Sequence, residues 1–321
     1  MSAGSRQGPG LGAVFAHREA SVALMIGLVF LFLCFASEFF LSPRNLLNVG
    51  RQASVVAIIA LGQALVIIGR GLDLSVGSTM GLSAVVAAYV GQQTGSQPLA
   101  LLAGPGTGLC VGLVNAMLCT RLNINPFIAT LGTLSIARGL ALLLSGGMPI
   151  AFTGWAEFLG SGRLFGEFPV ALALMLALAV IVQVFATRTR LGRNVYAIGD
   201  SPVAARLAGI NVEGTRVLVY AVCGALAGLG GMIVAGNMAS ASPDLGRGYE
   251  LDIIAAAILG GVALSGGRGS IYGVVLGALL MALLNNAFVL LGISAHWQIV
   301  SKGLVIIIAV GIDGFQRGRE D

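Results

Sequence analysis

Residues 169–187 read PVALALMLALAVIVQVFAT, a run of 19 positions without a charged side chain. A helix needs about 20 predominantly apolar residues to cross the hydrocarbon core of a bilayer, so this run predicts a transmembrane helix. The composition of the whole chain agrees, because 57% of its 321 residues are hydrophobic and 10% are charged, with a mean hydropathy of +0.95. Soluble domains carry about 25% charged residues, and a chain this poor in charge is typical of a membrane protein.

Further apolar runs lie on both sides of this one. We expect an all-α integral membrane protein of about ten transmembrane helices, forming a single transmembrane domain over residues 1–321. The third and eighth predicted spans are short or interrupted by glycine, so either could be a broken or re-entrant helix. The ten predicted spans cover residues 22–41, 53–69, 76–91, 98–120, 126–145, 169–187, 217–236, 251–264, 270–291 and 299–313.

Glycine is unusually frequent, at 48 of 321 residues, which is about twice its ordinary share. Small residues let transmembrane helices approach closely, and helix association in a bilayer depends on such packing. Glycine pairs four positions apart are therefore candidate helix contacts, and they occur at Gly77/Gly81, Gly108/Gly112, Gly224/Gly228 and Gly273/Gly277.

The distribution of arginine and lysine predicts which side of the membrane each loop faces. If the N-terminus lies inside, 12 basic residues fall on the cytoplasmic side, and the four on the outer side are Arg44, Arg51, Arg163 and Arg247. This excess satisfies the positive-inside rule and predicts that both termini are cytoplasmic. The cytoplasmic segments would then be an N-terminal tail over 1–21, a loop over 187–216 and a C-terminal tail over 314–321.

The fourth and ninth predicted spans share a weak glycine-rich pattern. If the pattern is genuine, the two halves of the chain form an inverted repeat, as in many transporters. Chance similarity between two glycine-rich helices explains the same pattern, and both explanations stay open.

The longest polar stretch, residues 187–216, contains a short helix signature. Ser201 can cap free amides, Pro202 suits a first helical turn, and Gly209 suits a left-handed stop. A two-turn helix is not stable alone, so it either packs on its own subunit or inserts into a groove on a cytoplasmic partner. We favour the partner, because small residues permit close approach. The predicted helix comprises Ser201, Pro202, Val203, Ala204, Ala205, Arg206, Leu207, Ala208 and Gly209.

Two other segments place polar side chains beside or within predicted spans. Residues 69–78, GRGLDLSVGS, form either a capped helix break or a charged break that lines a water-filled path. The polar residues of 125–138 either hydrogen-bond between helices or face a hydroxylated solute. The candidate path residues are Asp73, Ser75, Asn125, Thr130, Thr133 and Arg138.

The most charged outward segment, residues 236–250, contains Asp244, Arg247 and Glu250. It is either an ordinary solvated loop or a docking site for an external partner, because binding residues often lie on loops.

Taken together, the chain resembles the permease family of bacterial ABC importers that includes the ribose, xylose and galactoside permeases. Residues 69–78 resemble the family's Gly-Gly-Ile-Asp-Leu-Ser-Val-Gly-Ser signature, and residues 125–133 resemble its Asn-Pro-Phe-Ile-x-Thr-Leu-Gly-Thr stretch. Residues 190–210 are similar to its cytoplasmic loop. Matches to its later segments follow in the same order at 257–269 and 298–313.

The sequence departs from the family's pattern at two places. Arg70 stands where the signature usually has glycine, and Asp200-Ser201 stands where Gly-Asn usually follows Gly199. Neither departure changes the resemblance, but both weaken any inference about which substrate is carried.

The resemblance implies a transporter subunit that hydrolyses nothing and holds no cofactor or metal. Two such chains, identical or different, would form a pore in the bacterial inner membrane. Two cytoplasmic ATP-binding subunits would contact the 201–209 helix through Ala204, Ala205 and Gly209. A periplasmic or lipid-anchored binding protein would deliver a small sugar, either a pentose, a hexose or a related monosaccharide. The scattered basic residues do not indicate a nucleic-acid partner.

The main alternative is a ten-span secondary transporter of small solutes. Such a protein should divide five-plus-five around a central loop, whereas the long loop here follows the sixth predicted span. A membrane enzyme is a weaker alternative, because the sequence has no H-E-x-x-H motif and no clustered metal ligands.

Overall fold

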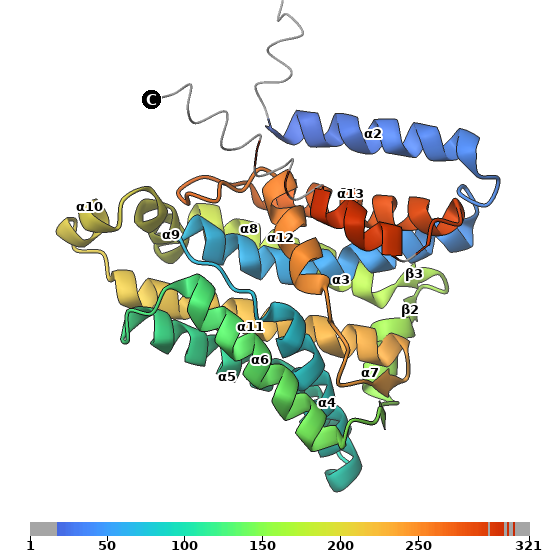
Figure 1. Ribbon diagram of the computed structural model, residues 1–321, viewed down its shortest axis with the longest axis horizontal. Helices are drawn as coiled ribbons and strands as arrows, with labels where there is room; N and C mark the ends of the chain where they lie inside the picture. Colours follow the sequence, from blue (N-terminus) through green and yellow to red (C-terminus); the bar gives the residue numbers. More distant parts are fainter. Residues whose placement is uncertain (1–17, 295, 305–306, 308–310, 312–321) are drawn as a thin grey trace, which may run out of the picture.

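The computed structural model describes residues 18–294, 296–304, 307 and 311, and this part of the chain is almost wholly helical (Figure 1). The all-α prediction is confirmed. The helices are α2 (Arg18–Ala36), α3 (Pro43–Ile68), α4 (Val76–Thr94), α5 (Gln97–Thr120), α6 (Pro126–Ser145), α7 (Trp155–Ser161), α8 (Val170–Arg188), α9 (Arg190–Asp200), α10 (Pro202–Leu207), α11 (Val212–Asn237), α12 (Tyr249–Leu259) and α13 (Ile271–Leu290). Residues 296–304 are also helical.

Local sequence explains where several helices begin. Ser42, Asn125 and Ser201 each accept a backbone N–H from the first turn of α3, α6 and α10, and each is followed at once by proline. A capping oxygen satisfies an amide that has no partner in the helix, and proline has no amide to leave unpaired there. Local sequence thus accounts for all three starts, although α3 begins ten residues before the apolar span predicted from residue 53.

Seven of the described helices are long and apolar enough to cross a membrane: α2, α3, α5, α6, α8, α11 and α13. They match seven of the ten predicted spans. The predicted third span became α4, which has 19 residues but includes many polar and small side chains. The predicted eighth span became α12, whose 11 residues extend about 16 Å in a hydrocarbon core of about 30 Å. The tenth, 299–313, lies partly outside the described residues.

The count of ten spans is therefore not confirmed in the described part of the chain. Helix α12 ends early because glycines follow it at 260 and 261, in line with the expectation that the eighth span could be broken. The predicted cytoplasmic tails over 1–21 and 314–321 lie mostly or wholly outside the described residues. Their cytoplasmic placement stays a prediction from the arginine distribution.

Helices α3 and α11 form the centre of the molecule. The apolar window of α3 is 89% buried and that of α11 is 67% buried, whereas that of α2 is only 11% buried. Figure 1 accordingly shows α2 at the edge, next to α13, with α3 and α11 inside the helix bundle. The largest cluster of buried apolar side chains runs from α3 through α4, α11 and α12.

Glycine lets α5 and α11 touch backbone to backbone. A Cβ built on Gly108 would lie 2.0 Å from the carbonyl oxygen of Gly224, and one built on Gly224 would lie 2.1 Å from the carbonyl oxygen of Gly108. Two of the predicted small-residue pairs therefore meet each other across one helix contact. This is the close approach that glycine permits in a membrane protein.

Short strands and one short helix lie at the end of the bundle opposite α9 and α10 (Figure 1). Strand β1 (Ile150–Ala151) pairs antiparallel with β4 (Ser240–Ala241), and β2 (Arg163–Leu164) pairs antiparallel with β3 (Phe168–Pro169). The two ends of the bundle therefore differ in structure, with α9 and α10 at one and α7 and the strand pairs at the other.

The polar stretch expected as a loop over 187–216 is mostly helical. It contains α9, α10 and the first turn of α11. The signal for α9 is present in the sequence, because Leu191, Val195 and Ile198 recur at helical spacing, and the last two are buried. The structure therefore corrects the loop to two short helices leading into a long one.

Candidate functional site

A buried polar network joins the break before α4 to α5 and α6. Ser75 donates to Asp73 Oδ1 from its backbone nitrogen at 2.8 Å and from its hydroxyl at 2.6 Å. Asn115 Nδ2 donates to Asp73 Oδ2 at 3.1 Å and to Ser75 Oγ at 2.9 Å. Thr133 Oγ1 donates to Asn115 Oδ1 at 2.6 Å. All four residues are at most 5% exposed, so three separate segments share one internal network.

Gln63 and Tyr220 hold the backbone of the same break. The Gln63 amide lies 3.3 Å from the carbonyl oxygen and 3.2 Å from the nitrogen of Asp73, and it pairs with both when its own nitrogen faces the carbonyl. The Tyr220 hydroxyl donates to the carbonyl oxygen of Leu72 and accepts from its amide, both at 3.3 Å. Irregular backbone can be buried only when its polar groups are paired, and α3 and α11 supply these partners.

Three of the six predicted path residues, Asp73, Ser75 and Thr133, meet in this network. Thr130 is buried nearby on α6, but its hydroxyl donates at 2.7 Å to a carbonyl one turn earlier on its own helix. Asn125 is exposed and caps α6 by accepting the amide of residue 127 at 2.9 Å. The side chains of these two residues are therefore not part of the network, although the Thr133 hydroxyl also donates to the carbonyl oxygen of Thr130 at 3.1 Å.

Arg138, the sixth predicted path residue, contacts the outward segment instead. Its Nη1 donates to the carbonyl oxygens of Pro243 and Leu245, the second at 2.9 Å. Asp244 lies between these two residues in the chain and Arg247 follows them, and both charged side chains are exposed. One arginine of α6 thus anchors the segment that was predicted to meet an external partner.

Glu250, the third predicted contact residue, is half-buried near the start of α12. A Cβ built on Gly77 of α4 would lie 2.3 Å from its Oε2. The carboxylate therefore packs against α4 and presents less of its surface than the exposed Asp244 and Arg247 do.

Helix α10 confirms the short helix predicted over 201–209. Ser201 Oγ accepts the amide of Ala204 at 3.2 Å, and Gly209 has the left-handed φ of +79° expected at a helix stop. Ala205 was expected at the contact with the ATP-binding subunit, but its side chain is 4% exposed and packs with Ile198 and Val212 of the neighbouring helices.

The other face of α10 is open. Val203 is 71% exposed and Leu207 is 85% exposed, and the two are one turn apart on a six-residue helix. Arg206 and Ala208 are also exposed. The short helix is thus fixed to its own subunit by one small residue while it presents apolar side chains outward.

Helix α9 is in turn fixed to the loop that precedes α13. The Tyr196 hydroxyl donates to the carbonyl oxygen of Gly269 at 3.1 Å. Burial of this side chain raises the pKa of its hydroxyl, so the donor keeps its proton at neutral pH.

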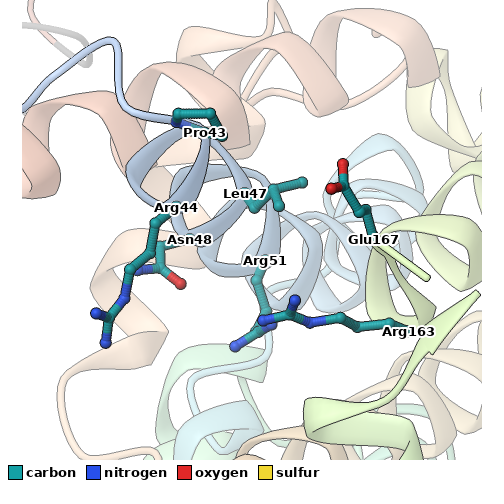
Figure 2. Close-up of a pocket in the computed structure, with 7 residues that line it drawn as sticks. All are labelled: Pro43, Arg44, Leu47, Asn48, Arg51, Arg163 and Glu167. Carbon is teal, nitrogen blue, oxygen red and sulfur yellow. The ribbon is translucent and has the colours of Figure 1, made fainter.

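A basic pocket of ≈ 480 Å³ lies at the first turns of α3 (Figure 2). Figure 2 shows Arg163 reaching from β2 toward Arg51 on α3. Arg51 donates to Asn237 Oδ1 at 3.2 Å, while its buried Nε has no partner among the described residues. The lining residues are Pro43, Arg44, Leu47, Asn48, Arg51, Arg163 and Glu167.

Three of the four basic residues that the sequence analysis assigned to the outer side line this pocket, namely Arg44, Arg51 and Arg163. The fold thus brings these three arginines together with Glu167 at one hollow. Sequence reasoning missed the pocket, because Arg163 is far from Arg44 and Arg51 in the chain and only the fold brings them together.

Sequence reasoning also missed two polar residues that organise the network, Gln63 and Asn115. The signal was available, because each is an amide side chain inside an otherwise apolar predicted span. Their partners could not be predicted, since that requires knowing which helix faces meet.

Comparison with known proteins identifies relatives over nearly the whole chain. Residues 45–310 match the family described as the permease component of branched-chain amino acid transport systems. The chain is 39% identical over 280 residues to the ribose import permease protein RbsC of Escherichia coli K12, covering 85% of this chain and 87% of that protein. It is 40% identical over 277 residues to RbsC of Bacillus subtilis 168, covering 85% and 86%. It is 36% identical over 322 residues to the galactose/methyl galactoside import permease protein MglC of E. coli K12, covering 94% and 96%.

Proposed function

Because the chain belongs to the family of permease components of branched-chain amino acid transport systems, we propose that it is the membrane-spanning subunit of an ABC importer for a small sugar. Its relatives are named as ribose and galactose/methyl galactoside import permeases, and the similarity covers 87% and 96% of those two proteins. The substrate would be a pentose, a hexose or a related monosaccharide. The chain would act as a multi-pass protein of the bacterial inner membrane and would not itself be an enzyme.

The observation that carries the proposal is that one face of α10 is buried and the other is exposed. Ala205 fixes the helix to its own subunit, and Val203 and Leu207 leave an apolar face uncovered at one end of the bundle. Exposed apolar side chains rimmed by polar groups are typical of interaction sites. We propose that this face inserts into a cytoplasmic ATP-binding subunit, of which two would serve two permease chains in a homodimer or a heterodimer.

We place a sugar-binding protein, periplasmic or lipid-anchored, at the opposite end of the bundle. Asp244 and Arg247 are exposed there on a segment held by Arg138, and Glu250 lies beside them. The basic pocket around Arg51 and Arg163 would receive acidic side chains of that protein. Complementary charge of this kind mainly sets orientation and association rate.

Translocation would use the polar groups of α4, α5 and α6. Asp73, Ser75 and Thr133 present hydroxyl and carboxylate groups that suit the hydroxyls of a sugar, and Thr130, Asn125 and Arg138 lie along the same helix as Thr133. In the described conformation the network around Asp73 is buried, and its side chains bond to one another. ATP-driven rocking of the helices would have to separate α4, α5 and α6 to expose it, and no proton relay is needed.

The test is to purify the tagged chain from its native host in mild detergent and to identify the proteins that accompany it. An ATP-binding subunit should co-purify with the wild-type chain and be lost from Leu207→Asp and Val203→Asp variants, which change exposed side chains only. Leu122→Asp, which alters another exposed leucine between α5 and α6, is the control and should retain it. A chain that purifies alone and transports in ATP-free vesicles would overturn the proposal in favour of a secondary transporter.

A further inference from the structure

Arg70 occupies a backbone conformation that usually belongs to glycine. Its φ is +60°, in the left-handed region where a side chain other than glycine's brings Cβ against the following carbonyl. A residue is retained in such a conformation when surrounding contacts over-determine it. The contacts of its side chain therefore need an explanation.

The Arg70 guanidinium bridges two other segments. Its Nε donates to the carbonyl oxygen of Ser265 at 2.9 Å, and its Nη2 donates to the carbonyl oxygen of Asp200 at 2.9 Å. Asp200 is the last residue of α9 and directly precedes Ser201, the cap of α10. Ser265 lies in the loop between α12 and α13. One side chain thus joins the end of α3 to the α9–α10 connection and to the second half of the chain.

Glycine brings the same three segments together at the backbone. The amide of Gly267 donates to the carbonyl oxygen of Ile68 at 2.9 Å, and a Cβ built on Gly199 would lie 1.8 Å from that oxygen. A Cβ built on Gly266 would lie 2.5 Å from Arg70 Cγ. We call residues 68–70, 199–200 and 265–267 the three-segment junction. Figure 1 shows α9 beside the end of α3 and the loop that precedes α13.

The junction includes Arg70 and Asp200, and both belong to places where the sequence departs from the pattern it resembles. Arg70 replaces a glycine of the signature, and Asp200-Ser201 replaces Gly-Asn. These positions are 130 residues apart yet are joined by the bond from Arg70 to the Asp200 carbonyl. The acceptor is the backbone carbonyl of Asp200, so the bond places the two departures side by side without involving the Asp200 side chain.

We propose that Arg70 is a positioning residue that transmits movement of α10 to the membrane core. This rests on the proposed function, in which the ATP-binding subunit moves α10. Only Ser201 separates α9 from α10, so a displaced α10 must carry the Asp200 carbonyl with it. Arg70 passes that displacement to residues 71–73, which lead into the Asp73 network, and to the loop before α13.

The competing explanation is that Arg70 only satisfies free carbonyls at the end of α9. Both bonds of its guanidinium are exposed to solvent, and a basic side chain near a helix C-terminus is stabilising there. A purely structural role predicts loss of fold stability, whereas a positioning role predicts loss of coupling in a protein that remains folded. The two are separated by measuring sugar uptake and ATP hydrolysis in the same sample.

The experiment uses the complete complex, with its ATP-binding subunit and binding protein, reconstituted in vesicles. Arg70→Gly relieves the left-handed strain, so we expect unchanged thermal unfolding and unchanged retention of the ATP-binding subunit. Sugar moved per ATP hydrolysed should fall at least about fivefold, the lower end of ordinary coupling between sites. Arg70→Lys has a single terminal nitrogen in place of the fork and should be intermediate. Arg121→Gly, an exposed arginine between α5 and α6, should match wild type.

A second variant tests whether the two departures belong together. Arg70→Gly combined with Asp200→Gly and Ser201→Asn restores the resembled pattern. We expect it to recover most of the coupling, because glycine at 70 occurs in that pattern together with Gly-Asn at 200–201, and neighbouring changes can compensate each other. The proposal is overturned if Arg70→Gly couples like wild type, if uptake and hydrolysis fall in proportion together with thermal stability, or if the triple variant is no better than Arg70→Gly. A wild-type chain that captures no ATP-binding subunit would instead overturn the proposed function, and the role of Arg70 with it.

Discussion

Asn115 donates its side-chain amide to the carboxylate of Asp73 at 3.1 Å, across a separation of 42 residues. The same side chain accepts the hydroxyl of Thr133 at 2.6 Å. Asn115 is therefore the one member that contacts both the break before α4 and the middle of α6. A movement that separates these helices must break a bond to Asn115, which makes this residue the most direct probe of the network.

Thr133→Val should destabilise the chain more than Thr130→Val, although both replace a buried threonine on the same helix. Loss of the Thr133 hydroxyl leaves the Asn115 carbonyl oxygen without its donor, at a cost of about 1 kcal/mol. Thr130 donates only to its own helix, so its loss removes no contact between helices. Thermal unfolding in detergent measures the difference, and equal shifts for the two variants would contradict the network.

Gly108→Ala should disrupt the contact between α5 and α11, whereas Gly106→Ala should not. A Cβ at 108 would overlap the carbonyl of Gly224, while a Cβ at 106 meets no atom within 4 Å. Overpacking of this kind costs about 1–3 kcal/mol, and alanine at the open position favours the helix by about 1 kcal/mol. The melting temperature should thus fall for the first variant and stay level or rise for the second. A fall in both would indicate a general effect of alanine on α5.

Lys302→Met should be more damaging than the double change Lys302→Met with Asp252→Asn. Lys302 Nζ lies 2.7 Å from Asp252 Oδ2, and the aspartate side chain is 5% exposed. Removal of one partner leaves a buried charge unpaired, at a cost of about 3–5 kcal/mol, whereas the double variant leaves none. Thermal unfolding of the wild type, the two single variants and the double variant measures the coupling free energy between the two side chains. Additive changes in stability would show that the ion pair contributes nothing.

Arg138→Leu should loosen residues 242–248, the part of the 236–250 segment that Arg138 contacts, without altering the fold elsewhere. The variant removes the donor to two backbone carbonyls, so this segment should exchange its amide hydrogens faster and become more sensitive to protease. Hydrogen exchange of the purified chain measures this, with the α9–α10 region as the internal reference. Arg138→Lys should retain part of the protection, and unchanged exchange in Arg138→Leu would show that the segment is held by other contacts.

The sequence predicts best those features that local chemistry determines. Ser201, Pro202 and Gly209 place α10 correctly because capping, proline and left-handed glycine act over a few residues. Arg138 was expected near the path but contacts the outward segment, because the contacts of a long side chain depend on which loop folds over it.

Sequence prediction is less successful where the role of a residue depends on partners that are far away in the chain. Asn115 appears in the sequence only as a polar residue in an apolar run, and its role depends on the face of α5 that meets Asp73. For α12 the glycines at 260 and 261 did signal an interrupted span, but the apolar run of 251–264 continues past them, so hydropathy alone did not give the end of the helix at Leu259.

The division of α10 into an inward Ala205 and an outward Val203 and Leu207 separates two kinds of evolutionary constraint. Substitutions at Ala205 must respect the packing of this chain, whereas substitutions at the outward pair must match only the surface that covers them. Under the proposed contact with an ATP-binding subunit, the outward pair could therefore change with that partner while Ala205 and the helices behind it stay as they are.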